Sequence, residues 1–476
     1  MSIIFKLYYL LKMSSSEIDI KKYICERCLY LISNFGDDPS SNIKKEEVIK
    51  IKSKPDCNFC FGLFEFDLYK DIISEVKRKI VEYDHIDFKF SLSFSFIFDL
   101  VHYFWKCYFK ANKQHNIQNT AFIEVNSLKL ILKHIFLPHF AKEIHESFSL
   151  DSDLKIEIGF EFPQSIYDEV NAMFKYLNKN ITLNPNDKQK TNIGLKPILD
   201  MPSSLIIAVF QKFDLYNIAS RLNPKIGVER VLSFIKDPLY IKGNYNKFSR
   251  EIGQSPWEIN GERVCVSSVE EEMKFIVIKK YEAEDLKFSA GGREDRDVRM
   301  LGGGRPFMLE IINPKKNMEK EIKKIEEEIN KTSKFIKVHN LEVCNKEYTE
   351  TIKKAEVNKT KIYTCFVWVQ KIITDEDINK LNTLKNLELT QKTPIRVLHR
   401  RSLMDRKKII YEMKAEKISE HFMILDVVAS AGTYIKEFVH SDLMRTEPSV
   451  KSLLDCDIDI LQLDVRDLIL FDQIHK

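Results

Sequence analysis

The sequence lacks a membrane-spanning run, a secretion signal and a strong excess of charge of either sign. Residues 2–13 are apolar, but two lysines interrupt them, and the run is too short to cross a bilayer. It has no small-residue cleavage site and no arginine, which argues against a signal or transit peptide. No other segment has the length and apolar character of a membrane span. We therefore expect residues 1–14 to be an unstructured or non-native extension, and we expect no membrane partner.

The charges are nearly balanced. The chain has 74 Lys and Arg against 70 Asp and Glu, a formal net charge of +4, and 44% of its 476 residues are hydrophobic. This composition is typical of a soluble globular protein, and it permits a nucleic-acid partner without requiring one. A chain of this length is expected to form two or three domains.

The cysteines do not suggest a secreted disulfide framework, because their number is odd and they are scattered over a large chain. Four of them form two C-x-x-C pairs, Cys25 with Cys28 and Cys57 with Cys60. Two such knuckles supply the four thiolates of a closed structural zinc site. The alternative is one redox C-x-x-C motif and a chance pair, although no thioredoxin-like βαβ pattern surrounds them. The sequence therefore predicts a structural zinc ion in a zinc-binding region, residues 15–65, and a reducing compartment, cytoplasmic, nuclear or both.

Hydrophobic periodicity predicts an α+β domain over residues 66–235. Every even position from 88 to 96 and from 154 to 162 is apolar, which is typical of strands with one buried face. Helical patterns cover 65–82 and 128–147, and we expect Pro138 to break or kink the second. The polar stretch 178–192 is predicted to be a loop. We interpret the histidines of this half as core or surface residues: His102, His134, His139 and His145.

Residues 289–312 are the most suggestive stretch for chemistry. A glycine-preceded cluster places Asp295 in a loop beside Arg293, whose charge would keep the carboxylate ionised. Such a carboxylate can act as a nucleophile. A triple glycine follows at 302–304, and Pro306 is predicted to begin a buried strand. From the residues alone, a surface salt-bridge loop is the favoured interpretation.

Two further regions have the composition of an RNA-binding surface. In residues 240–257, aromatic and basic side chains alternate in a way that suits stacked bases and phosphates, although core packing would explain the aromatics equally well. Residues 396–408 hold the densest basic patch, which is either a solvated face or a phosphate-binding surface. Its members are Arg396, His399, Arg400, Arg401, Arg406, Lys407 and Lys408.

The remaining carboxyl-terminal half is predicted to contain strands at 361–368 and 458–465 and a helix opening after Gly432. Residues 314–360 look like a charged insertion that carries an amphipathic helix and no chemistry.

With these residues in view, the chain resembles the archaeal and eukaryotic tRNA pseudouridine synthases that carry an amino-terminal zinc-binding THUMP domain. The resemblance rests on four motifs in the family's order, which together span residues 240–465. They are YIKGNYNKFSREIGQSPW, GREDRDVRMLGGGRPF, QKTPIRVLHRRS, and AGTYIKEFVHSDLMRTEPS followed by DILQLDV. The C-x-x-C pairs with CNFCFGLFE resemble the family's zinc region.

The resemblance implies an isomerase that acts on T-loop uridine of tRNA, at position 55, position 54 or both, without an organic cofactor. It implies an α+β fold: a zinc-knuckle and THUMP-containing domain over the first part of the chain, and a pseudouridine synthase domain over 236–476 with a mixed, largely antiparallel central sheet. A monomer is favoured.

The resemblance also implies residue roles. Asp295 would break the glycosidic bond, either by attacking the nucleoside or by assisting glycal formation, and Arg293 would orient it and keep it ionised. Tyr363 would stack on the base and help remove the C5 proton, and Leu461, with Leu463 as the alternative, would pack beneath the base. The remaining substrate contacts expected are Lys242, Tyr245, Lys247, Arg250, Arg400, Arg401, Lys436 and Arg445.

The chain departs from the family pattern at two places. Arg296 stands where family members usually carry an apolar residue, and residues 314–360 look expanded. The main alternative function is a non-catalytic RNA-binding or processing adaptor of the same fold. A THUMP-bearing methyltransferase or thiolation enzyme would need a cofactor loop, and the sequence has neither a G-x-G-x-x-G nor a G-x-x-x-x-G-K-[ST] motif.

Overall fold

The computed structural model describes residues 18–34, 48, 50–65, 67–112, 125–177, 179, 181–184, 196–199, 201–222, 228–259, 261–399 and 401–470. The chain divides into two compact units, Met1–Lys236 and Asp237–Lys476. The expected extension 1–14, most of the expected loop 178–192 and Arg400 lie outside the described residues. None of the helices in the described ranges has both the length and the apolar character that crossing a membrane requires.

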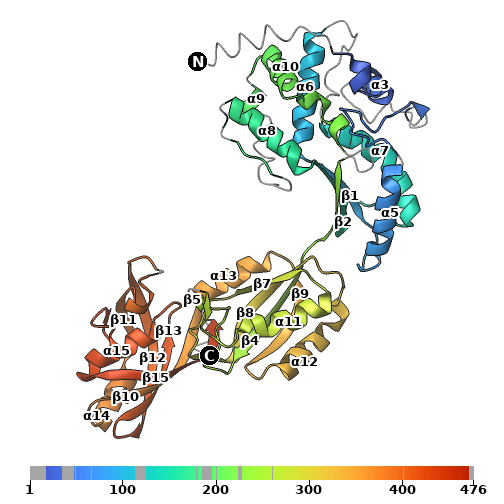
Figure 1. Cartoon of the computed structure of the whole chain (residues 1–476). Helices are drawn as coiled ribbons and strands as arrows, with labels where there is room; N and C mark the ends of the chain where they lie inside the picture. The colour runs from blue at the N-terminus through green and yellow to red at the C-terminus, as the bar shows by residue number, and fades with distance from the viewer. Residues whose placement is uncertain are drawn as a thin grey trace, which may run out of the picture. The chain divides into compact units, whose positions relative to one another are not determined.

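The first unit contains a three-stranded sheet in the order β1-β2-β3 (Figure 1). Its strands are β1 (Lys89–Phe94), β2 (Leu154–Glu161) and β3 (Glu229–Lys236). The first pair is parallel and the second is antiparallel. The alternation that predicted β1 and β2 is confirmed, because Phe90, Leu92 and Phe94 are buried on one strand and Leu154, Ile156 and Ile158 on the other.

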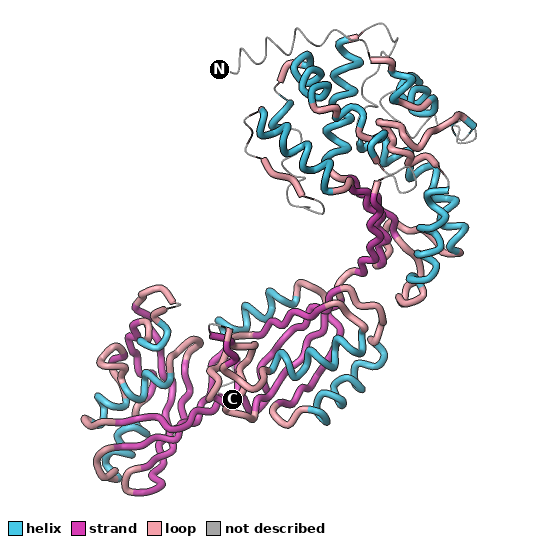
Figure 2. Tube along the Cα trace, viewed as in Figure 1, coloured by secondary structure: helices cyan, strands magenta, loops and turns pink. Residues whose placement is uncertain are grey.

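Helices make up most of the rest of this unit, as Figure 2 shows. They are α2 (Ile20–Tyr23), α3 (Glu26–Asn34), α5 (Asp67–Ile80), α6 (Phe96–Ala111), α7 (Val125–Ile144), α8 (Gln164–Tyr176), α9 (Lys196–Leu199) and α10 (Ser203–Lys212), with 3₁₀ turns η3 (Leu215–Asn217) and η4 (Ala219–Arg221). Pro138 does not break α7, which continues on both sides of it. Ile131 and Ile135 before the proline and Phe140 after it are all buried, so the core holds both halves of the helix.

The second unit is built on a ten-stranded sheet, with strands in the order β14-β11-β12-β13-β10-β15-β8-β4-β9 and β7 paired to β8. The strands are β4 (Leu239–Lys247), β7 (Asp285–Ala290), β8 (Val298–Ile312), β9 (Ile336–Cys344), β10 (Lys359–Val369), β11 (Lys385–Lys392), β12 (Asp405–Ser419), β13 (Phe422–Ala429), β14 (Thr446–Glu447) and β15 (Ile458–Leu470); β5 (Glu258–Ile259) and β6 (Glu262–Arg263) form a separate hairpin. All pairs in the large sheet are antiparallel except β8 with β15. The sheet is therefore mixed and largely antiparallel, as the resemblance implied.

Helices α11 (Val269–Tyr281) and α12 (Ile322–Thr332) cover one face of the part of the sheet that contains β4, β8 and β9 (Figure 1). The other helices are α13 (Tyr348–Asn358), α14 (Asp375–Thr383), α15 (Ile435–His440) and α16 (Val450–Leu454), with 3₁₀ turns η5 (Glu319–Glu321) and η6 (Ile395–Val397). The stretch 314–360, which its charge suggested to be an insertion, contributes elements to the core of this unit. Its strand β9 pairs with β4 along the sheet, and Ile325 and Ile329 of α12 are buried in the core.

The triple glycine is also part of the sheet, whereas the sequence placed it before the strand. β8 begins at Val298 and pairs with β15 through Met300. It pairs with β4 at Met300 and again from Arg305 onward, so residues 301–304 form a bulge in the pairing with β4. Asn244 and Asn246 donate to the carbonyls of Gly303 and Gly302 at 2.9 and 3.0 Å. A Cβ at Gly302 would lie 2.0 Å from the carbonyl oxygen of Arg466, so only glycine allows β15 to approach this closely.

Candidate active site

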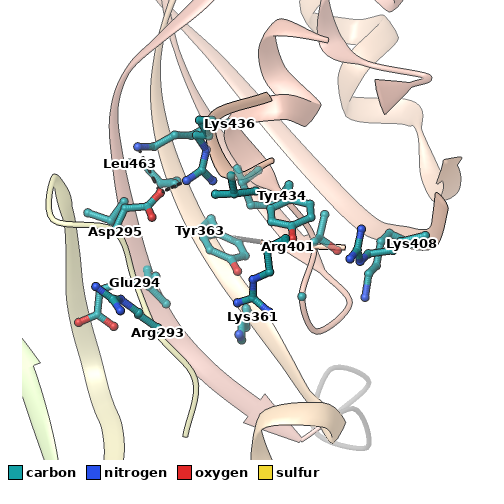
Figure 3. A pocket seen from close by; sticks show the side chains of 18 of the residues that line it. Arg293, Glu294, Asp295, Lys361, Tyr363, Arg401, Lys408, Tyr434, Lys436 and Leu463 are labelled. Carbon is teal, nitrogen blue, oxygen red and sulfur yellow. Dashed lines mark ion pairs between the residues drawn. The ribbon is translucent and has the colours of Figure 1, made fainter. Parts of the chain in front are cut away.

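A cavity of about 600 Å³ lies in the second unit, where β8, β10, β12 and β15 meet the loop that follows β7 (Figure 3). Its volume is within the range of small-molecule sites. The side chains and glycine that line it are Arg293, Glu294, Asp295, Val298, Arg305, Lys361, Tyr363, Arg396, Val397, Arg401, Arg406, Lys408, Gly432, Thr433, Tyr434, Ile435, Lys436, Leu463 and Val465. Most of the polar members are cationic, so the cavity suits an anionic ligand.

Asp295 contributes a partly accessible carboxylate to this cavity. Its side chain is 36% exposed, its Oδ2 lies 2.8 Å from Nη1 of Arg396, and Lys436 Nζ is 3.5 Å away. The sequence assigned the role of partner to Arg293. Among the described residues, the ion pairs of Asp295 are instead with Arg396 and Lys436. Glu294, which stands between Arg293 and Asp295, turns into the core.

Each of the two cations is tied to a second carboxylate. Arg396 Nε donates to Glu437 Oε1 at 2.7 Å, and Lys436 Nζ donates to both carboxylate oxygens of Asp297 at 2.9 and 2.8 Å. Burial alone would lower the pKa of Arg396, but the hydrogen bond to Glu437 and the charges of Glu437 and Asp295 raise it. Arg396 therefore stays charged, and both cations are fixed on two sides.

The loop that carries Asp295 is anchored by a buried ion pair. Arg305 Nε lies 2.7 Å from Glu294 Oε2, and both side chains are 1% exposed. Tyr245 Oη donates to Glu294 Oε1 at 2.8 Å, and Gln254 Nε2 donates to Tyr245 Oη at 2.7 Å and to the Gly292 carbonyl at 2.8 Å. Tyr245, expected to contact substrate, is fully buried, and in the structure it supports this loop.

Lys247 and Arg250 also hold the loop instead of facing the cavity. Lys247 Nζ donates to the carbonyls of Ile252, Asp295 and Arg296 at 3.1, 3.2 and 2.7 Å. Burial lowers its pKa to about 8. Arg250 donates to carbonyls of the loop and of β15, at Asp297 (2.8 Å) and Leu463 (2.7 Å), and to Asp464 Oδ1 at 2.6 Å.

Three more of the expected substrate contacts lie outside the cavity. Lys242 pairs with Glu342 on β9 at 3.0 Å, and Arg445 donates to the Thr393 carbonyl at 2.7 Å. Leu461 is 50% exposed, because it is the extra residue of a bulge where β15 crosses Phe366 and Val367 of β10. Leu463, the alternative, lines the cavity, and Arg401 and Lys436 do so as well.

Tyr363 forms part of the cavity wall from β10 and is 7% exposed. Burial raises its pKa, so its hydroxyl keeps its proton at neutral pH. Two further wall residues, Lys361 and Tyr434, were given no role by the sequence, and Arg396, Arg406 and Lys408 were assigned only to a basic patch that was either a solvated face or a phosphate-binding surface. Strand periodicity could have found some of them, because Lys361 with Tyr363 and Arg406 with Lys408 stand two apart on a strand and so share a face.

A second candidate site lies in the first unit. Cys25, Cys28, Cys57 and Cys60 are buried, and their sulfur atoms all lie within 4.8 Å of one another. Four thiolates this close can serve as the complete ligand set of one metal ion. The loop between the second pair is supported by α6, because Trp105 Nε1 donates to the Asn58 carbonyl at 3.2 Å.

Comparisons with known proteins identify the family of this chain. A family model described as "Pus10, C-terminal" matches residues 240–468. The human protein named tRNA pseudouridine synthase Pus10 is 32% identical over 444 residues, which cover 91% of this chain and 83% of the human protein. The Xenopus laevis protein of the same name is 45% identical over 230 residues, which cover 48% of this chain and 44% of that protein. The alignment with this relative thus spans less than half of its length.

Among solved structures, a Cbf5-Nop10-Gar1 complex is similar over 48% of this chain and 50% of the matched chain, with 15% identity and a TM-score of 0.28. The family assignment rests on the sequence matches, above all on the human relative, because that alignment includes both units. The chain belongs to the Pus10 family of tRNA pseudouridine synthases.

Proposed function

We propose that this chain isomerises uridine in the T loop of tRNA, at position 55, position 54 or both, to pseudouridine, with Asp295 as the catalytic residue. Membership of the Pus10 family supports tRNA as the substrate. One observation carries the role of Asp295: a partly exposed carboxylate is held by two cations inside a cavity that also contains Tyr363. A carboxylate held between two cations can attack a sugar carbon or assist the ionisation of that carbon.

The cavity offers a place for a base that has left its stack. Removing a base from its stack costs a few kcal/mol. Stacking of the base on an aromatic side chain such as Tyr363 offsets roughly 1–3 kcal/mol of this cost. Leu463 and Val465 supply apolar wall. Asp295 would then break the glycosidic bond, by attack or through a glycal, and the uracil would rejoin the sugar through C5. Because Tyr363 keeps its proton, its role as a platform is favoured over a role as a phenolate base.

Substitution of Asp295 tests the proposal. We expect Asp295→Asn to keep tRNA binding and to lower tritium release from C5-labelled uridine in tRNA by at least about 10³-fold, because the reacting group is lost. Asp297→Asn is the matched control, since it removes a neighbouring carboxylate that pairs with the same lysine, and its effect should be smaller. Release near the wild-type rate in Asp295→Asn would remove this residue from the mechanism. Wild-type chain that binds tRNA but releases no tritium would favour an RNA-binding adaptor.

We also propose that the cysteine cluster binds one structural zinc ion. Tetrahedral zinc takes four thiolates in closed sites of this kind, and the binding energy acts as folding energy for the surrounding chain. Metal analysis of the purified protein is the test. About one equivalent of zinc per chain is expected, and less than about half an equivalent would count against the site.

A further inference from the structure

The cavity has two ends with different electrostatics. At the Asp295 end, each cation pairs with a carboxylate. We call the other end, formed by Arg401, Arg406 and Lys408, the cationic end. Figure 3 shows Lys408 and Asp295 on opposite sides of the cavity, with Tyr363 and Tyr434 between them.

The cationic end holds positive charge that is oriented but not neutralised. Lys408 Nζ donates to the Ala431 carbonyl at 2.6 Å, and Arg406 Nη1 donates to Thr393 Oγ1 at 3.0 Å. These partners are neutral. In the part of the chain that the structure describes, Arg401, Arg406 and Lys408 form no ion pair with a carboxylate. Arg401 is exposed, whereas Arg406 and Lys408 are partly buried. Partly buried cations without a counter-ion indicate a place for an anion.

Two further features keep this end ready for an anion. Gly432 has a φ of +70°, and a Cβ there would lie 3.2 Å from Lys408 Nζ, so the glycine leaves the ammonium group uncrowded. Burial, followed by the nearby charge of Arg406, lowers the pKa of Lys408, which is the direction expected when two cations lie close together without an anion.

We propose that the cationic end binds a backbone phosphate of the RNA strand next to the target uridine, with Arg406 and Lys408 as its ligands. This inference rests on the function proposed above and adds to it a specific part of the substrate. When the target base stacks on Tyr363 within reach of Asp295, the cationic end remains available to the RNA strand that continues from this nucleotide. The guanidinium of Arg406 can donate two parallel hydrogen bonds to phosphate, and Lys408 adds a point charge.

The test measures binding of a full-length tRNA in which each T-loop phosphate in turn is replaced by an uncharged methylphosphonate. With the full wild-type chain, we expect one position to weaken binding about tenfold, as the loss of a charge-assisted contact should. Arg406→Gln should bind the unmodified tRNA and that methylphosphonate tRNA equally. It should also lower the slope of log affinity against log salt by about one.

Lys407→Gln is the matched control, because it removes the same charge from the neighbouring residue, whose side chain points to the opposite face of β12. Lys407→Gln should lose affinity for the methylphosphonate tRNA as the wild type does. Arg406→Lys should show part of this loss. Thermal unfolding of each variant shows whether it is folded, and Lys408→Gln provides a second variant at the same site. The inference would be overturned if each methylphosphonate lowered tRNA affinity equally in the wild type and in both Gln variants. It would also be overturned if no T-loop phosphate position affected binding. Since the readout is binding, a chain that binds tRNA in this way but makes no pseudouridine would refute only the proposed reaction.

Discussion

At the residue scale, the position of Asp295 depends on a carboxylate that does not itself line the cavity. Glu437 is 1% exposed and fixes Arg396, while its Oε2 has no hydrogen-bond partner among the described residues. We expect Glu437→Gln to loosen Arg396 and let Asp295 move, so that kcat falls by roughly 10- to 100-fold. The affinity for tRNA should not change, because Glu437 does not reach the cavity. Single-turnover tritium release and equilibrium binding measure the two quantities.

The control for this prediction is Glu412→Gln, which removes an exposed carboxylate that pairs with Lys385 on the surface of the same unit. Both kcat and the dissociation constant should stay at the wild-type level. A parallel loss of tRNA affinity and kcat in Glu437→Gln would indicate general loss of structure and contradict a positioning role. Recovery of part of the rate in Glu437→Asp would support it.

Lys247 makes the stability of the second unit depend on pH in an alkaline range. Burial lowers its pKa from 10.5 to about 8, although the charges of Glu294 and Asp297 oppose this. Between these two pH values the unfolded chain holds a proton that the folded chain has lost, so the free energy of unfolding rises with pH. Below about pH 8 the lysine is charged in both the folded and the unfolded chain, so the full cost of burying that charge opposes folding. We expect Lys247→Gln to lack this rise, which amounts to at most roughly 3 kcal/mol.

Urea unfolding of both chains from about pH 7 to about pH 10 measures the difference, because other titrating groups are common to both. The prediction would be contradicted if the free energy of unfolding changed with pH in the same way for the wild type and for Lys247→Gln.

At the element scale, the bulge of β8 is set by the close approach of β15 to the triple glycine. Gly302 has a φ of +59°, and an added Cβ would lie 2.0 Å from the Arg466 carbonyl oxygen. We expect Gly302→Ala to lose more than about 3 kcal/mol of unfolding free energy, because the backbone of β15 must move. Gly261→Ala is the control: its φ is +83°, but no heavy atom lies within 4 Å of the added Cβ. It should lose only the conformational cost, roughly 1–2 kcal/mol.

Denaturant unfolding of the two variants measures both losses. Equal losses would mean that the close contact does not fix the bulge.

Local periodicity predicted those elements whose burial follows from their own residues. The alternation over 88–96 and 154–162 gave β1 and β2, and the spacing of Ile325 and Ile329 gave α12, because one face of each element meets the core. The triple glycine was different. Its place in a bulge depends on pairing with β4 and β15, and the composition of residues 300–306 does not reveal which strands will pair with them.

The same limit applies to the candidate site. The motif around Asp295 pointed to a carboxylate that lines the cavity, but the ion-pair partner of this carboxylate is Arg396, from a distant segment, and not the adjacent Arg293. The choice between Leu461 and Leu463 depended on a bulge opposite β10 that strand periodicity cannot reveal. Aromatic and basic residues at 245–250 looked like RNA contacts because sequence alone does not distinguish a buried hydrogen-bond network from an exposed one.

At the scale of the whole molecule, the division into two units separates the cysteine cluster from the cavity. Each unit has its own hydrophobic core, and all four cysteines belong to the first. The chain has three tryptophans. Trp105 is fully buried in the first unit and bonded to the loop of the second cysteine pair, whereas Trp257 and Trp368 belong to the other unit. Trp105 fluorescence therefore reports on the cysteine cluster that is proposed to bind zinc.

We expect a strong zinc chelator to unfold the first unit and to shift Trp105 emission to the red, because structural zinc supplies folding energy and water then reaches the indole. The unfolding of the second unit should not change, since its core contains no residue of the cluster. In Trp105→Phe the chelator should produce no red shift, which identifies the source of the signal. Unchanged Trp105 emission after complete removal of the metal would mean that the four cysteines are not needed to hold the first unit together, and that its aromatic core is sufficient.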